Sequence, residues 1–246
     1  IAKIINVSDG MMFISQDAQR EVENYTRELI GEKKAKERWY DYFHLGSDFT
    51  GNTFNTDAVR VEIKNFFGNT EPVFLMVSTI EPRKNHVYLL DVFDKLWAEG
   101  VDVKLCFIGR LGWKYEDILD RIKNHTELDK RFLMVNDASD EELEFCYKNA
   151  KSLLFPSHAE GFGLPIVEAL QRGLPVMASD IPVFREVGGD YVTYFDQNNP
   201  QTLVSLVKDF ITNGKFPAVK SLQNWSWINW KESTRIFMEH IIKHLK

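Results

Sequence analysis

Cysteine is scarce in this sequence of 246 residues, and long hydrophobic runs are absent. Its two cysteines, Cys106 and Cys146, lie in apolar segments without CxxC spacing or a partner histidine. A structural zinc site and a disulfide framework are therefore poorly supported, and we predict that both thiols pack in the core. No segment approaches the roughly eighteen consecutive apolar residues of a membrane-spanning helix, and residues 1–6 form no signal peptide. We expect a cytoplasmic protein.

Positive charge is in the minority, with 30 Lys and Arg against 36 Asp and Glu, a net charge of −6 and a pI near 5.6. This balance argues against a surface that follows a nucleic-acid backbone, so no nucleic-acid partner is expected. Hydrophobic residues make up 44% of the chain and aromatic residues 13%, which is too apolar for a disordered protein. The length predicts one or two globular domains.

Short apolar runs alternate with amphipathic stretches from residue 71 onward, which is the pattern of a parallel sheet covered by helices. We expect strands at residues 73–77, 103–108, 131–135, 152–155, 175–178 and 191–195. We expect helices at residues 85–100, around 118–122, and at 139–150, 164–172, 199–212 and 227–245. Asn85 is predicted to cap the first of these helices, and Ser139 with Glu142 forms a capping box at the third.

The first 70 residues follow this pattern less clearly. Residues 10–15 predict a strand and residues 16–29 a helix, while the charged run at 32–38 predicts a solvated helix end or loop. Residues 46–56 are rich in Gly, Ser, Thr, Asn and Asp, which is typical of a linker. This region is too small to close an independent Rossmann-like layer.

The strongest candidate for a site is the segment FPSHAEGFGLPIVEA, from Phe155 to Ala169. A strand is expected to end there, and Gly161 and Gly163 let the backbone approach a ligand closely. A helix then begins at Pro165, where the missing amide costs nothing. The free amides at that helix start favour an anion such as a phosphate.

Two carboxylates, Glu160 and Glu168, flank this loop, the second in the first turn of the expected helix. Carboxylates accept hydrogen bonds from hydroxyls, so the pair is suited to bind a sugar or ribose beside the phosphate. The residues alone support a structural interpretation equally well, in which Glu168 complements the helix dipole and Glu160 is a solvated loop acid. The loop is not a dinucleotide fingerprint, because Ile166 stands where the third glycine belongs.

A second candidate follows the first expected strand, at residues 78–85, with the sequence STIEPRKN. Ligands of an open α/β sheet bind outside the carboxyl ends of the strands. Arg83 and Lys84 stand at such an end and could neutralise a diphosphate. Surface cations are common, so these two residues alone are a weak signal.

Together, these two segments and several shorter phrases resemble a known family. The segment EGFGLPIVE, from Glu160 to Glu168, resembles the E-x7-E signature of retaining nucleotide-sugar glycosyltransferases. Residues 71–212 resemble the donor-binding half of glycosyltransferase family 4, which has the GT-B fold. The supporting phrases, in the expected order, are FISQ at 13–16, FHLG at 43–46, EPRKN at 81–85, SDEEL at 139–143, ASDIP at 178–182, REVG at 185–188 and WSW at 225–227.

The resemblance implies an α/β fold in which a Rossmann-like parallel sheet is flanked by helices, with a partial second domain. Residues 1–56 would be the end of the acceptor-side first domain and the linker. Residues 57–220 would be the donor-binding domain, and residues 221–246 a helix that crosses back to the first domain. Much of the family's acceptor domain is not in this sequence, so we expect a fragment that binds donor and transfers no sugar.

By position, the resemblance assigns Arg83 and Lys84 to the donor diphosphate, Glu160 to hydroxyls of the transferred sugar and Glu168 to the ribose. Catalysis would depend on the first three. The further donor-binding residues would be Thr79, Gly109, Gly161, Phe162, Gly163 and Leu164. Many members have Gly-Arg where this chain has Ser78 and Thr79, which removes one phosphate cation. His44 and His158 match no histidine of the family's site, and we interpret both as structural or peripheral.

The implied activity is retaining transfer of a hexosyl residue from a nucleotide sugar, GDP-mannose or a similar donor, to a glycan or lipid-linked acceptor. Neither a metal nor a cofactor is expected, and the setting would be surface-polysaccharide biosynthesis. The resemblance also suggests peripheral association with the inner face of the membrane through the part of the first domain outside this sequence, and oligomer formation. The alternative is a non-catalytic nucleotide-sugar-binding subunit of a larger assembly. A GT-B epimerase or hydrolase is a weaker reading.

Overall fold

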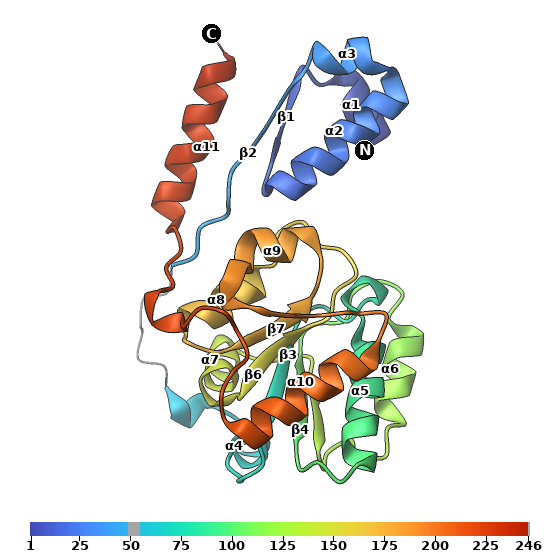
Figure 1. Ribbon diagram of the computed structural model, residues 1–246, viewed down its shortest axis with the longest axis vertical. Coiled ribbons are helices and arrows are strands. Elements are labelled where there is room, and N and C mark those ends of the chain that lie inside the picture. The colour runs from blue at the N-terminus through green and yellow to red at the C-terminus, as the bar shows by residue number, and fades with distance from the viewer. Residues whose placement is uncertain (49–54, 246) are drawn as a thin grey trace.

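The computed structural model describes residues 1–48 and 55–245. Within these residues the strands form a two-stranded and a six-stranded parallel sheet (Figure 1). The predicted alternation from residue 71 is confirmed, because each expected strand is present within two residues of its expected bounds. The chain therefore has the predicted α/β fold, with a Rossmann-like sheet flanked by helices.

The six-stranded sheet has the order β5-β4-β3-β6-β7-β8. Its strands are β3 (Val73–Val77), β4 (Lys104–Ile108), β5 (Phe132–Val135), β6 (Ser152–Phe155), β7 (Val176–Ser179) and β8 (Thr193–Phe195). The helices around it are α4 (Val61–Phe67), α5 (His86–Ala98), α6 (Glu116–Lys123), α7 (Asp140–Asn149), α8 (Leu164–Gln171), α9 (Pro182–Gly188) and α10 (Pro200–Asn213). The order reverses between β3 and β6, so the carboxyl ends of these two strands flank the usual ligand position of an open α/β sheet.

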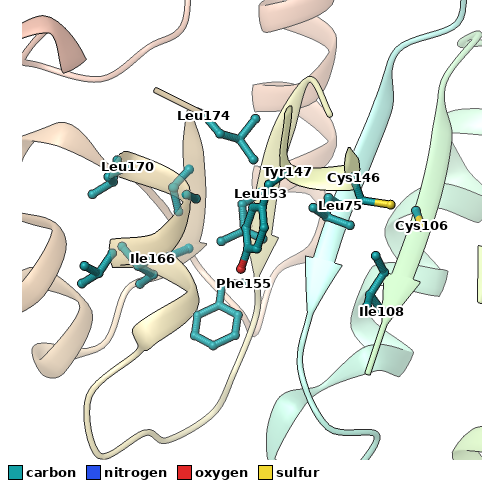
Figure 2. Packing of buried hydrophobic residues seen from close by; sticks show 14 of the residues in the cluster. Leu75, Cys106, Ile108, Cys146, Tyr147, Leu153, Phe155, Ile166, Leu170 and Leu174 are labelled. Atoms are coloured by element: carbon teal, nitrogen blue, oxygen red, sulfur yellow. The ribbon is translucent and has the colours of Figure 1, made fainter. Parts of the chain in front are cut away.

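Successive strand residues alternate between the two faces of the sheet. Leu75 and Phe155 pack with α4, α7, α8 and α9 on one face, whereas Phe74 and Phe107 pack with α5, α6 and α10 on the other. Strands buried on both faces read as continuous apolar runs, which is why the sequence predicted them well. Figure 2 shows the first of these cores.

Both cysteines belong to that first core, as predicted. Cys106 of β4 and Cys146 of α7 are free and fully buried, and their sulfur atoms point toward each other (Figure 2). Burial raises the pKa of the Cys106 thiol well above its usual value. The Cys106 thiol therefore stays protonated, and both side chains pack as small apolar groups.

The N-terminal unit contains β1 (Gly10–Phe13), β2 (Trp39–Tyr42), α1 (Ala2–Val7), α2 (Gln16–Ile30) and α3 (Glu32–Lys36). The expected strand and helix at 10–29 are present, and the charged run forms the short helix α3, most of which is exposed. The terminal helix α11 (Trp230–His244) lies beside β2 (Figure 1). The Trp39 and His244 rings stack 4.4 Å apart, and Asp41 lies 3.0 Å from His240.

One expected helix cap and one expected helix start are wrong. Asn85 precedes α5 in a left-handed conformation, with φ 60°, and its side chain donates to the carbonyl of Pro156 instead of accepting from the helix amides. The terminal helix begins at Trp230 and not at Trp227. The Trp227 indole donates to the Leu45 carbonyl at 2.8 Å, and the Asn229 side chain caps the helix.

Among the α-helices and strands of the described residues, α1, β2, α4 and α9 were not predicted. Within the predicted linker 46–56, residues 49–54 lie outside the described residues, as does residue 246 of the predicted terminal segment. The boundaries at 56 and 220 stay predictions. No helix in the described part of the chain combines the length and apolar character needed to cross a bilayer.

Candidate functional site

Two adjoining clefts open beside the carboxyl ends of the central strands. The larger, of about 460 Å³, is lined by Val77, Ser78, Thr79, Lys84, Ile108, Gly109, Arg110, Asn136, Ala138, Asp140, Leu143, Leu164, Pro165 and Glu168. The smaller, of about 290 Å³, is lined by Ile14, Leu45, Lys84, Phe155, Glu160, Gly161, Phe162, Gly163, Leu164 and Pro165. Lys84, Leu164 and Pro165 belong to both linings, so the two clefts meet at one cation and at the start of α8.

The floor of the larger cleft is formed where the chain leaves β3 and β4. The amide of Ser78 donates to the Ile108 carbonyl at 2.9 Å, which continues the strand pairing to the sheet edge. Gly109 follows directly, and a Cβ at this position would lie 1.8 Å from the Ser78 carbonyl oxygen. Glycine is therefore required at 109 for the two chain segments to approach each other.

The loop before α8 depends on Gly163 more than on Gly161. Gly163 has φ 106°, and an added Cβ would also lie 3.1 Å from the Phe184 ring. At Gly161 a Cβ would meet Ile14 at an ordinary 3.4 Å. The Phe162 side chain is buried, and its ring contacts those of His44 and Trp227, so the loop packs against the segments that follow β2 and precede α11.

Glu160 is the centre of a partly buried ion-pair cluster, and it is not a solvated loop acid. Its two carboxylate oxygens accept from Arg83 and from Lys84, each at 2.5 Å, and the Ser157 hydroxyl donates to it at 2.8 Å. Arg83 also donates to Glu81 at 2.7 Å. The side chains of Lys84, Glu160 and Glu81 are 12%, 8% and 9% exposed, so these three charges are held largely away from water, whereas Arg83 is 39% exposed.

The cluster balances two cations against two carboxylates. Burial opposes the charged form of Arg83, but Glu160 and Glu81 outweigh this effect and raise the pKa of the guanidinium. Arg83 therefore keeps its charge, and its hydrogen bonds orient the carboxylates of Glu160 and Glu81. The lining of the larger cleft includes the cations Lys84 and Arg110 but not Arg83, so an anion in that cleft would lie beside Lys84 and Arg110.

Glu168 lies on α8, facing the larger cleft. It is the fifth residue of the helix, so its expected placement in the first turn is wrong, and a role for it in complementing the helix dipole loses support. The hydroxyl of Tyr147 donates to its carboxylate at 2.8 Å. Burial, together with this carboxylate, raises the pKa of Tyr147 well above its usual value, so the phenol remains a donor.

A neutral histidine follows the cation pair two residues later in the chain. His86 is buried, and its Nε2 atom lies 3.2 Å from the Ser78 hydroxyl. Burial, followed by the positive charge of Lys84, lowers the pKa of His86 to about 3. The imidazole therefore adds no charge beside Lys84 at neutral pH.

The structure brings the predicted site residues together around these two clefts, and their individual roles stay predictions. Sequence reasoning missed Ser157, Glu81 and Tyr147 as partners of the predicted residues. Ser157 lies two residues after the end of β6, a position that signals a sheet-edge site. Nothing in the sequence links Tyr147 to Glu168, because α7 and α8 meet through tertiary packing.

The predicted peripheral histidines contact other parts of the chain. His44 lies 2.7 Å from Glu186, and His158 is exposed with its ring 2.9 Å from the Gln197 side chain. Across residues 1–48 and 55–245, no group of three or more His, Cys, Asp or Glu side chains is arranged to hold a metal ion.

The fold is a Rossmann-like domain of the GT-B type, joined to a smaller α/β unit. Residues 60–226 match the family described as Glycosyl transferases group 1. The chain belongs to this family.

Among curated relatives, the serotype-specific mannosyltransferase WbdA of Escherichia coli is 34% identical over 205 residues, which cover 81% of this chain and 24% of WbdA. The O-antigen chain mannosyltransferase RfbU of Salmonella typhimurium is 29% identical over 172 residues, covering 66% of this chain and 47% of RfbU. This chain thus spans about a quarter to a half of the length of these relatives.

Solved structures show the same fold at low sequence identity. Sucrose-phosphate synthase from Thermosynechococcus elongatus has a TM-score of 0.72 at 18% identity, over 99% of this chain and 60% of that protein. Anabaena HepE in complex with UDP and glucose has a TM-score of 0.74 at 16% identity, over 98% of this chain and 65% of that protein.

Proposed function

We propose that the two clefts bind one nucleotide-sugar donor, with the nucleotide in the larger cleft and the sugar in the smaller. The observation that carries this proposal is the junction between the clefts, which Lys84 shares with the first residues of α8. A diphosphate at that junction would meet an ammonium group and the positive end of a helix dipole. These are the groups that stabilise a departing diphosphate.

The carboxylates fit the two ends of such a donor. Glu168 faces the larger cleft with one oxygen held by Tyr147, which leaves acceptor capacity for the ribose hydroxyls. Glu160 lines the smaller cleft, where it would accept hydrogen bonds from hydroxyls of the sugar. Its two cationic partners and Ser157 fix its orientation before a ligand arrives.

The reaction we propose is hexosyl transfer with retention of configuration. The bond between the anomeric carbon and the diphosphate oxygen breaks, and the electron pair leaves with the diphosphate beside Lys84. The hydroxyl oxygen of the acceptor forms the new bond on the same face of the sugar, and its proton passes to the departing phosphate oxygen. Glu160 is a poor nucleophile, because both of its oxygens are engaged by cations.

The relatives favour mannose as the transferred sugar, since WbdA and RfbU are named as mannosyltransferases. We therefore propose GDP-mannose or a similar donor, a glycan or lipid-linked acceptor, and a cytoplasmic role in surface-polysaccharide synthesis. No cofactor enters this scheme.

A thermal-shift panel with UDP-, GDP-, ADP- and dTDP-sugars tests the proposal. A donor at 100 times its dissociation constant should add about 2.7 kcal/mol to the free energy of unfolding. Glu168→Gln should weaken nucleotide and nucleotide sugar alike. Glu160→Gln should weaken the nucleotide sugar and leave the nucleoside diphosphate nearly unaffected, because only the sugar reaches the smaller cleft. Absence of a shift with every donor would contradict the proposed function.

A further inference from the structure

The start of α2 is hydrogen-bonded to the donor-binding unit through a glutamate that has no role in the proposed donor site. Glu186 of α9 accepts from the amide of Gln16 at 2.7 Å through one carboxylate oxygen and from the amide of Asp17 at 3.0 Å through the other. His44 Nε2 lies 2.7 Å from the first oxygen. In Figure 1 the start of α2 lies toward α9.

The Glu186 carboxylate is charged in this contact. The Glu186 side chain is 13% exposed. Burial alone would raise its pKa, but the hydrogen bonds from His44 and the two backbone amides outweigh burial and lower it. The carboxylate is thus charged and complements the positive end of a 15-residue helix.

A second contact joins the same helix start to the loop of the proposed sugar site. Ser15 is fully buried and caps α2 by accepting from the amide of Ala18 at 3.1 Å. Its hydroxyl donates to the carbonyl of Gly161 at 2.7 Å. The residue before Gly161 is Glu160, so the helix cap contacts the loop beside the carboxylate proposed to bind the sugar.

We infer that Glu186 and Ser15 are positioning residues, which fix the loop carrying Glu160 against the N-terminal unit. The inference rests on the proposed function for its link to the sugar. Glu186 fixes the start of α2 through its hydrogen bonds with the amides of Gln16 and Asp17. Ser15, at the same helix start, then fixes Gly161 through its hydrogen bond to the Gly161 carbonyl. Loss of either residue should loosen the loop that lines the smaller cleft, while the larger cleft keeps its lining.

The test compares Glu186→Gln and Ser15→Ala with Glu99→Gln, a matched control in an exposed pair with Lys208. Amide hydrogen exchange is followed at residues 16–18 and 161–163. Both test variants should exchange faster than the unmutated chain at residues 161–163, and the control should not. Unchanged exchange at residues 161–163 in both variants would overturn the inference, whatever the ligand.

Affinity for GDP and GDP-mannose separates positioning from general destabilisation. GDP should bind each variant within about twofold of the unmutated chain, whereas GDP-mannose should bind about fivefold or more weakly to the two test variants. Equal losses for both ligands would contradict a positioning role. If the unmutated chain binds neither ligand, the mannose-donor proposal fails, and the exchange data still decide whether the contact fixes the loop.

Discussion

Replacing Lys84 with methionine should lower both stability and nucleotide affinity, and adding Glu160→Gln should restore only the stability. Methionine keeps the apolar stem near the Phe155 ring, which lies 5.6 Å from the Lys84 ammonium. The substitution leaves Glu160 with a buried charge and one partner fewer. The second substitution removes that charge but returns no cation to the phosphate position.

The magnitudes follow from the partners that remain. Glu160 keeps Arg83 at 2.5 Å and Ser157 at 2.8 Å, so Lys84→Met should cost about 1–3 kcal/mol, less than the 3–5 kcal/mol of breaking an isolated buried pair. The double variant should return to within about 1 kcal/mol of the unmutated chain. Loss of a charge-assisted contact to phosphate should weaken nucleotide binding about 10- to 100-fold in both variants.

Denaturant unfolding and calorimetric titration with a nucleoside diphosphate measure the two effects separately. Glu160→Gln alone is the control and should keep its nucleotide affinity. Unchanged affinity in Lys84→Met would show that the ammonium does not contact the phosphates. Recovery of affinity in the double variant would refute the assignment as well, because the phosphate contact would then not depend on Lys84.

Two further predictions concern the residues around the cation pair. Between pH 7.5 and pH 5 the unfolded chain takes up a proton at His86 that the folded chain, with a pKa of about 3, does not, so the free energy of unfolding should fall by about 2 kcal/mol. Urea titrations of His86→Gln should lack this part of the fall in the free energy of unfolding. An equal fall in the variant and in the unmutated chain would contradict the buried neutral state of His86. Gly109→Ala should destabilise the fold by several kcal/mol, since its Cβ would overlap the Ser78 carbonyl. A melting temperature equal to that of the unmutated chain would show that the two segments do not meet closely.

The large parallel sheet was predictable because each strand is buried on both faces and reads as an apolar run. The strand β2 was not predictable, because its sequence, Trp-Tyr-Asp-Tyr, includes the polar residue Asp41. The partner of Asp41 is His240 of α11, which is distant in sequence. The helix α9 begins at Pro182, the last residue of ASDIP, a phrase that indicates the family but has no helical pattern of its own. Local patterns therefore predicted the layers, and contacts distant in sequence decided the rest.

The same division holds for the site. Glu160, Glu168, Arg83 and Lys84 were found as motif residues, but sequence reasoning did not show that Glu160 would pair with both cations. That pairing joins segments 76 and 77 residues apart, so it depends on the strand order β3-β6. Asn85 was misread for a similar reason, because its side chain bonds to Pro156 and not to its own helix.

The most direct test of the account is a crystal structure of this chain with a nucleotide sugar selected by the thermal-shift panel. The account predicts the diphosphate at the junction of the two clefts, beside Lys84 and the start of α8, with the ribose at Glu168 and the sugar at Glu160. A nucleotide bound elsewhere, or bound with its phosphates more than about 4 Å from the Lys84 ammonium, would contradict the central claim.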